Sequence, residues 1–166
     1  MIYIIMGVSG CGKTTIGSGL SKSLGTEYHD ADGFHPEANI EKMRSGKPLN
    51  DDDRIAWLNN IHEAINAKPL SKTVVISCSA LKAKHRAFLR TTDHEVVFCF
   101  LQGSKDLIRE RILARENHYF KESLLDSQFE TLEEPKTALY CDVSKTPEDI
   151  INFIISETSK KKVLNS

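Results

Sequence analysis

The chain begins Met1-Ile-Tyr-Ile-Ile-Met-Gly-Val-Ser-Gly-Cys-Gly-Lys-Thr-Thr15, and this stretch decides the fold. Residues 2–6 form an apolar run that is typical of a buried parallel strand. Residues 7–14, the phosphate loop, match the pattern G-x-x-x-x-G-K-[ST] at every fixed position. Residues 15–24 continue as a helix. A loop of this pattern between a strand and a helix indicates phosphate binding, whereas a ligand-free glycine-rich turn is the alternative.

The residue types of the phosphate loop explain how it would hold phosphates. Its three glycines let the backbone curl so that successive N–H groups point inward, and the following helix adds its positive N-terminal end. Lys13 supplies a cation for the terminal phosphates, and Thr14 supplies a hydroxyl ligand for Mg²⁺. We therefore predict a nucleoside triphosphate site made by Gly7, Val8, Ser9, Gly10, Cys11, Gly12, Lys13, Thr14 and Thr15.

Length and composition predict a single domain over residues 1–166. Hydrophobic residues make up 40% and charged residues 27%, and a net charge of −1 points to neither a nucleic-acid nor a membrane surface. The four cysteines lack C-x-x-C spacing, and neither a signal peptide nor a membrane span is recognised. We expect a reduced, cytoplasmic protein that binds no nucleic acid and no membrane.

Strand and helix patterns alternate along the chain. Further strands are predicted at residues 26–29, 73–77, 95–101 and 139–143. Helices are predicted at residues 36–44, from a cap at Asn50 or Asp51, at 80–90, at 104–116 and from Pro147, with a mixed segment at 117–135. The helix after Asn50 is expected to bury the stripe Ile55, Leu58, Ile61, Ala64 and Ile65.

This alternation predicts an α/β fold of three layers, with a five-stranded parallel sheet and helices on both faces. Ligands in such sheets bind beyond the carboxyl ends of the strands. We therefore expect residues 30–32, residues 77–79 and the phosphate loop to lie along one edge of the sheet.

Two aspartates after the second strand favour a small kinase over other nucleotide-binding proteins. The chain lacks an Asn-Lys-x-Asp guanine signature, and residues 77–79 replace the acidic pair of a motor ATPase. Asp30 and Asp32 lie two apart on an extended segment, so one can face a metal while the other faces an acceptor hydroxyl. An Asx turn before Gly33 is the alternative for this pair.

Arg111 and Arg115 supply a candidate lid, because a spacing of four residues puts them on one face at a helix end. Arginine there can stack on adenine and hold phosphates when a lid closes. A solvated face paired with Glu110 or Glu116 fits the same spacing. The spacing alone does not choose between the two interpretations.

At the level of longer motifs, the chain resembles the gluconokinases over essentially its whole length. The His-Pro, Pro-Leu-Asn-Asp and Gln-Phe-Glu-Thr-Leu stretches are the most specific parts of the resemblance. Its motifs are the phosphate loop, Asp30-Ala-Asp-Gly-Phe-His-Pro36, Asn39-Ile-Glu-Lys-Met43, Pro48-Leu-Asn-Asp-Asp-Asp-Arg54, Cys78-Ser-Ala-Leu-Lys82 and Gln128-Phe-Glu-Thr-Leu-Glu-Glu-Pro135. The resemblance implies the P-loop kinase fold of shikimate and adenylate kinases, a mobile lid at about 116–135, and a homodimer.

The resemblance also implies phosphorylation of D-gluconate by ATP, with Mg²⁺, to give 6-phospho-D-gluconate and ADP for the pentose phosphate pathway. By analogy with shikimate kinase, Asp30 would organise metal-bound water and Asp32 would deprotonate the 6-hydroxyl. Expected catalytic residues are Lys13, Asp32 and Arg115, and expected metal ligands are Thr14 and Asp30. Adenine is expected between Arg111 and the loop of Lys145, Thr146 and Pro147, and Arg115 is a further expected nucleotide contact.

Gluconate is an open-chain polyol with a carboxylate, so its site needs a fixed cation and several hydrogen-bond partners. Arg54 and Arg86 are candidates for the carboxylate, because a guanidinium can hold it through two hydrogen bonds. The candidates for the hydroxyls, beside Asp32, are His35, Lys82 and Gln128. Arg54 paired with acidic residues 51–53, and His35 in a loop-capping role, are the alternatives.

Two other functions stay open beside gluconate phosphorylation. One is a shikimate or nucleoside-monophosphate kinase with the same core, and the other is a nucleotide-dependent binding module without turnover. The intact Lys13, Thr14, Asp30 and Asp32 argue against the binding module. Cys11 lies near a helix N-terminus, which lowers a thiol pKa, so we expect sensitivity to thiol reagents.

Overall fold

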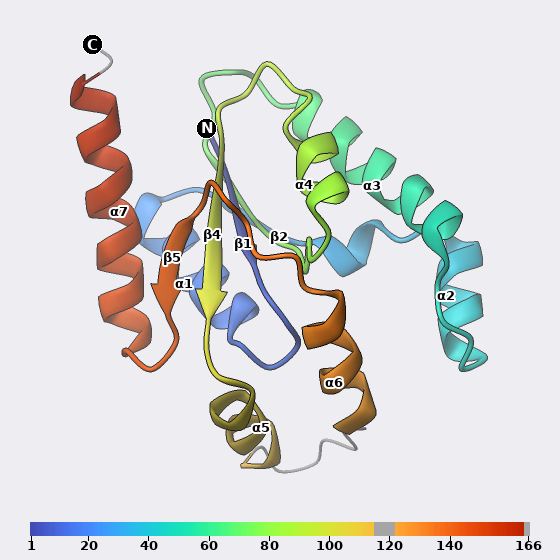
Figure 1. Ribbon diagram of the computed structural model, residues 1–166. Coiled ribbons are helices and arrows are strands. Elements are labelled where there is room, and N and C mark those ends of the chain that lie inside the picture. The colour runs from blue at the N-terminus through green and yellow to red at the C-terminus, as the bar shows by residue number, and fades with distance from the viewer. Residues whose placement is uncertain (115–121, 165–166) are drawn as a thin grey trace.

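A five-stranded sheet forms the centre of the part of the chain that the computed structural model describes, residues 1–114 and 122–164 (Figure 1). All neighbouring strands are parallel, in the order β2-β3-β1-β4-β5. The central strand β1 is buried at every residue, as its continuous apolar run predicts. The strands are β1 Ile2–Met6, β2 Glu27–Asp30, β3 Val74–Ser77, β4 Val96–Gln102 and β5 Leu139–Asp142.

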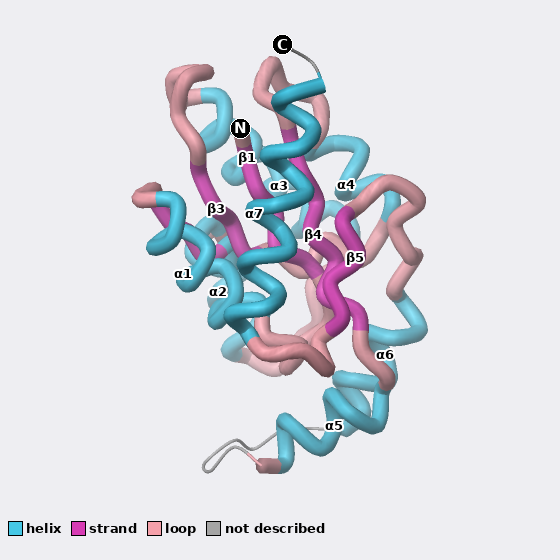
Figure 2. Tube along the Cα trace, turned by 90° about the vertical axis from the view of Figure 1, so that its left-hand side faces the viewer, coloured by secondary structure: helices cyan, strands magenta, loops and turns pink. Residues whose placement is uncertain are grey.

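Helices cover both faces of the sheet. α1 and α7 pack on one face, and α3 and α4 on the other, so that Figure 2 has the first pair in front of the sheet. Helix bounds are α1 Lys13–Leu24, α2 Glu37–Arg44, α3 Asp51–Asn66, α4 Ala83–Leu89, α5 Lys105–Leu113, α6 Glu122–Thr131 and α7 Pro147–Leu164, and the 3-10 helix η1 spans Ala31–Phe34. Within the described residues, none of these helices is long and apolar enough to cross a bilayer.

The alternation of strands and helices correctly predicts this three-layer α/β fold. Asp30 and Ile5 both pair with Ser77, so β1, β2 and β3 end close together. α5 and α6 lie beyond the carboxyl ends of the strands (Figure 1). The fold therefore brings the end of β2, the phosphate loop and the loop after β3 to one edge, where such sheets bind ligands.

Two local predictions on the face of α3 and α4 are wrong. Ile55 is 55% exposed, and Trp57, 5% exposed, is buried in its place. The indole N–H of Trp57 donates to the Ala31 carbonyl at 2.7 Å, which satisfies its polar atom inside the core. α4 begins at Ala83 and not near residue 80, because Ala80 has a left-handed φ of 40° that no helix can accommodate.

α6 lies inside the segment at 117–135 that the sequence pattern leaves mixed. Leu125, Phe129 and Leu132 follow the helical spacing i, i+4, i+7, and they pack into the apolar layer of α1 and α7. The predicted end of the preceding helix at residues 115–116 lies outside the described residues, as do residues 117–121. The structure thus adds a packed helix to the segment expected to form the lid.

The start of α3 is fixed by a capping box, which confirms Asn50 as its cap. The Asn50 side chain accepts a hydrogen bond from the Asp53 N–H, and the Asp53 carboxylate accepts one from the Asn50 N–H, both at 2.8 Å. Two of the otherwise unpaired donors of the first turn are satisfied in this way. This cap sets the position of the charged residues in the first turn of α3.

Replacing the cap should destabilise the fold modestly. Asn50→Ala removes the acceptor for the Asp53 N–H, and we expect a loss of about 1 kcal/mol in the free energy of unfolding. Urea denaturation followed by circular dichroism measures the change. Asn59→Ala, at an exposed position inside the same helix, is the matched control and should not lower the midpoint, because alanine favours a helix. Equal stability of the two variants would contradict the capping role.

Candidate active site

The phosphate loop joins β1 to α1 through glycines with positive φ. The φ angles are 144° at Gly7, 80° at Gly10 and 104° at Gly12, values that other residues rarely adopt. A Cβ atom added at Gly10 would lie 2.4 Å from Ile112 on α5, so glycine also permits close packing there. The loop is therefore curled as the pattern predicts, with α5 packed against its outer side.

The Lys13 ammonium lies against the phosphate loop, where it is predicted to bind the terminal phosphates of a nucleotide. Its Nζ donates a hydrogen bond to the Val8 carbonyl at 2.9 Å, which holds the cation beside the curled backbone. Thr14 and Thr15 are exposed in the first turn of α1. A phosphate that entered the loop would compete for the Lys13 ammonium with a neutral carbonyl, and a charged acceptor is the stronger partner.

Asp30 and Asp32 diverge at the end of β2. The Asp30 carboxylate accepts the Asp32 N–H at 3.0 Å and caps η1, so the Asx turn named as the alternative is present. Both carboxylates are exposed. Burial raises the pKa of the Cys78 thiol at the end of β3 to about 12, and the charges of Lys13, Asp32 and Asp30 also act on it. These charged groups therefore surround the carboxyl ends of β1, β2 and β3.

The oxygen atoms near the loop fit Mg²⁺. Kinases usually bind this ion through one or two protein oxygens and the phosphates of the nucleotide. The Thr14 hydroxyl and the second oxygen of the Asp30 carboxylate are such ligands. Among the described residues, no cluster of three or more His, Cys, Asp or Glu side chains could hold a metal by itself. The donor set therefore fits a metal that arrives with the nucleotide.

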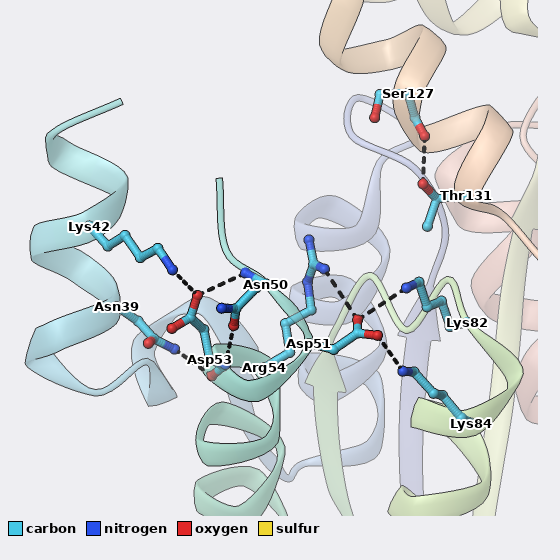
Figure 3. Close-up of polar contacts among 10 residues, drawn as sticks. All are labelled: Asn39, Lys42, Asn50, Asp51, Asp53, Arg54, Lys82, Lys84, Ser127 and Thr131. Carbon is cyan, nitrogen blue, oxygen red and sulfur yellow. Dashed lines mark hydrogen bonds and ion pairs between the residues drawn. The ribbon is translucent and has the colours of Figure 1, made fainter. Parts of the chain in front are cut away.

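Four predicted substrate residues meet in the polar corner, which consists of Asp32, His35, Asp51, Arg54 and Lys82. Asp51 pairs with Lys84 at 2.6 Å, Lys82 at 3.1 Å and Arg54 at 3.8 Å, as Figure 3 shows. Hydrogen bonds from Lys84 and Lys82 lower the pKa of Asp51 to about 2. The acidic partner proposed as the alternative for Arg54 is thus present, but at a long distance. The Arg54 side chain remains 36% exposed.

His35 is a half-buried candidate donor of this corner that also faces charge. Its ring stacks on Trp57, with centroids 4.8 Å apart and planes 12° from parallel. Burial lowers the His35 pKa, the charge of Asp32 raises it, and that of Arg54 lowers it again. His35, Asp32 and Arg54 are therefore neighbours, and the imidazole is neutral at pH 7.

Arg86 does not reach this corner. Its side chain is 4% exposed, and the guanidinium donates to the carbonyls of Ala80 and Leu81 at 2.8 Å and of Glu133 at 2.7 Å. Because these bonds engage its buried charge, the predicted contact between Arg86 and a substrate carboxylate is not supported. Arg86 instead holds the strained turn at Ala80, and Arg54 is left as the candidate for the carboxylate.

Gln128 contacts the phosphate loop rather than the polar corner. Its Oε1 accepts the Ser9 N–H at 2.6 Å, and its Nε2 donates to the Ser9 hydroxyl at 3.0 Å. Ser9 lies 119 residues away in sequence, so no local pattern could reveal this pair. Gln128 was predicted to contact a substrate hydroxyl. In this structure it instead bonds to the phosphate loop, on the nucleotide side of the site.

The expected adenine site is partly assembled. Arg111 donates to the Val143 carbonyl at 2.5 Å, which brings it to the loop that contains Lys145, Thr146 and Pro147. Thr146 caps α7 by accepting the Asp149 N–H at 3.2 Å. Arg115, the other predicted nucleotide contact, lies outside the described residues.

Cys11 corrects one expectation. Its side chain is 2% exposed, and burial raises the thiol pKa, although the nearby Lys13 acts in the opposite direction. Desolvation of the thiolate outweighs the positive end of α1 here. The predicted low pKa of Cys11 is therefore wrong, and we now expect this thiol to react slowly with thiol reagents.

Comparisons with known proteins agree with this site. The family model described as shikimate kinase matches residues 9–162. A probable gluconokinase of Xenopus tropicalis is 42% identical over 99% of this chain and 96% of its own length. The thermoresistant gluconokinase of Escherichia coli strain K12 is 41% identical, over 97% of this chain and 95% of its own. The chain belongs to the gluconokinases within the shikimate kinase family.

A solved gluconokinase has the same architecture. The crystal structure of a gluconokinase from Sinorhizobium meliloti 1021 matches with a TM-score of 0.88 and 35% identity, and the match covers 99% of this chain and 96% of that one. The family membership therefore extends over the sheet, the phosphate loop and the polar corner. The resemblance inferred from the sequence motifs is confirmed.

The Gln128 contact predicts a nucleotide defect and no primary defect in gluconate binding. Gln128→Ala leaves the Ser9 N–H without its partner, and we expect the KM for ATP to rise about tenfold, the effect of one lost hydrogen bond. Steady-state kinetics with each substrate varied in turn measures it. Ser127→Ala, at the exposed neighbouring position, is the control. A rise confined to the gluconate KM would instead restore the substrate-binding role predicted from the sequence.

Cysteine labelling tests the burial of Cys11. All four cysteines are buried, so the native protein at neutral pH should react with a thiol reagent far more slowly than protein in urea. The native rate should increase with pH, because the raised pKa keeps Cys11 protonated near pH 7. Cys11→Ala should show nearly the same native labelling. Rapid labelling of one thiol that disappears in this variant would contradict the result.

Proposed function

We propose that this gluconokinase family member transfers the γ-phosphoryl group of ATP to the 6-hydroxyl of D-gluconate, giving 6-phospho-D-gluconate and ADP. One observation carries the proposal: a complete phosphate loop lies at the same sheet edge as Asp32, His35 and Arg54. A nucleotide site and a polar site with both a carboxylate and cations are what transfer to an anionic polyol requires.

The nucleotide side supplies charge stabilisation. N–H groups of the curled loop would bind the phosphates, and Lys13 would move from the Val8 carbonyl to the terminal phosphates. Thr14 and Asp30 would hold Mg²⁺, which neutralises phosphate charge when bound. Arg111 would flank the adenine beside residues 145–147, and Arg115 would stabilise the transferred group. The reaction then depends on positioning and on charge, because phosphoryl transfer needs little covalent help.

The polar corner would supply the general base and the residues that bind gluconate. Asp32 would take the proton of the 6-hydroxyl as its oxygen attacks the γ-phosphorus and the bond to ADP breaks. Arg54 would bind the carboxylate, while His35 and Lys82 would bind hydroxyls. Asp51 neutralises only part of the charge of Lys82, Lys84 and Arg54, so the corner stays attractive to an anion.

Further parts of the proposal concern the whole protein. We propose that residues 1–166 act as one kinase domain and that about 116–135 forms the lid. We also propose that the protein is a cytoplasmic homodimer and that its product, 6-phospho-D-gluconate, enters the pentose phosphate pathway. These points rest on the family resemblance, and sedimentation of the purified protein tests the dimer.

An acceptor panel tests the reaction. A coupled ADP-release assay with MgATP should show turnover with D-gluconate, and none with shikimate, nucleoside monophosphates or no acceptor. Lys13→Ala should abolish this turnover, and Asp32→Asn should lower kcat on the order of 100-fold while ATP binding persists, because one oriented base is lost. Glu63→Gln, on the exposed side of α3, is the control. Turnover with another acceptor alone would overturn the substrate, and near-normal kcat in Asp32→Asn would overturn the base.

A further inference from the structure

A buried asparagine lies behind the histidine of the polar corner. Asn39 on α2 is 4% exposed. Its Nδ2 lies 2.8 Å from the Asp53 carbonyl oxygen and 3.4 Å from Nδ1 of His35. Figure 3 shows the Asn39 amide directed toward Asp53 at the start of α3. One nitrogen atom thus faces two potential acceptors on two neighbouring segments.

The Asp53 carbonyl determines how this amide is oriented. A carbonyl oxygen can only accept a hydrogen bond, so Asn39 must present its NH₂ group to it and not its oxygen. The same NH₂ group faces Nδ1 of His35. If Nδ1 carried a proton, two N–H groups would point at each other. Nδ1 is therefore the acceptor, and the proton of the neutral imidazole lies on Nε2.

The surroundings of His35 support a neutral ring in a fixed orientation. Trp57 on α3 stacks on one face of the ring. The charged groups that act on it are Asp32 on η1 and Arg54 on α3, which have opposite signs, and burial disfavours the imidazolium. Among the residues whose side chains the structure describes, none is hydrogen-bonded to Nε2, so this N–H is available to a ligand.

We propose that Asn39 is a positioning residue that holds His35 as the Nε2–H tautomer, so that His35 donates a hydrogen bond to an oxygen of the acceptor substrate. This role rests on the proposed function for the identity of the substrate. It divides the corner by polarity: His35 and Arg54 donate, and the exposed Asp32 carboxylate accepts. His35 therefore cannot compete with Asp32 for the proton of the reacting hydroxyl.

Nuclear magnetic resonance tests the tautomer without any substrate. The ¹⁵N shifts of a histidine ring distinguish a protonated nitrogen from a bare one, and the spectrum of His35→Gln assigns the His35 signals. Wild-type protein near pH 8 should show a bare Nδ1 and a protonated Nε2. A protonated Nδ1, or an equal mixture of the two tautomers, would overturn the inference.

Two substitutions at Asn39 separate positioning from structure. Asn39→Asp and Asn39→Leu both lose the bond to the Asp53 carbonyl, so a purely structural role predicts similar kinetics. In Asn39→Asp, however, the new carboxylate can only accept a hydrogen bond, so it favours the tautomer with the proton on Nδ1 and leaves Nε2 bare. At about pH 8 we expect its gluconate KM to exceed that of Asn39→Leu about tenfold, with equal ATP KM values.

The pH dependence gives a second signature. The carboxylate of Asn39→Asp should raise the His35 pKa, because an opposite charge favours the imidazolium. As the pH falls from about 8 to about 6, His35 gains its second proton and Nε2 carries hydrogen again. The gluconate KM of Asn39→Asp should then fall toward the wild-type value, while that of Asn39→Leu should not.

A double substitution and the acceptor panel complete the test. In a His35→Gln background, the difference between Asn39→Asp and Asn39→Leu should disappear, since it acts through the imidazole. A difference that persists would overturn the inference. Turnover of gluconate by an enzyme with a protonated Nδ1 would overturn the tautomer alone. The expected tautomer without gluconate turnover would overturn the proposed function and support the assignment of the proton.

Discussion

The tight curl of the phosphate loop is the constraint on which the active site depends. Positive φ angles at Gly7, Gly10 and Gly12 turn the backbone inward, and any side chain at Gly10 would collide with Ile112 of α5. The Ser9 N–H is bound by Gln128 of α6. The loop is therefore held from several sides before a nucleotide arrives, so little of the binding energy is needed to order it.

α3 organises the acceptor side in a comparable way. The Trp57 indole bonds to Ala31 and stacks on His35, and the Asn60 side chain donates to the Phe34 carbonyl at 2.9 Å. These contacts fix η1, which carries Asp32, against the buried side of α3. The first turn of α3 contributes Arg54. One capped helix thus positions the proposed base, the proposed carboxylate partner and the ring of His35 together.

Local sequence patterns correctly predicted features that depend on neighbouring residues. They did not predict contacts between segments that are distant in the sequence. The phosphate loop, the five strands and the Asn50 cap each follow from short stretches of sequence. Helical spacing did not reveal that Ile55 is exposed, and the role of Arg86 depends on the Ala80 turn and on Glu133. The chemistry of the substrate suggested Arg54, Arg86 and Gln128 as candidates, but it could not show that Arg86 and Gln128 bond to other parts of the chain.

α6 and the residues after it connect the two sides of the site. Gln128 binds the phosphate loop, while the Glu133 carboxylate accepts the Ala83 N–H at 2.6 Å, and its carbonyl accepts from Arg86. Leu125 anchors the same helix in the core with no exposed surface. A displacement of α6 would therefore disturb the nucleotide loop and the turn before α4 together, because both are bonded to α6 or to the residues directly after it. The segment proposed as the lid therefore also connects the two sides of the proposed site.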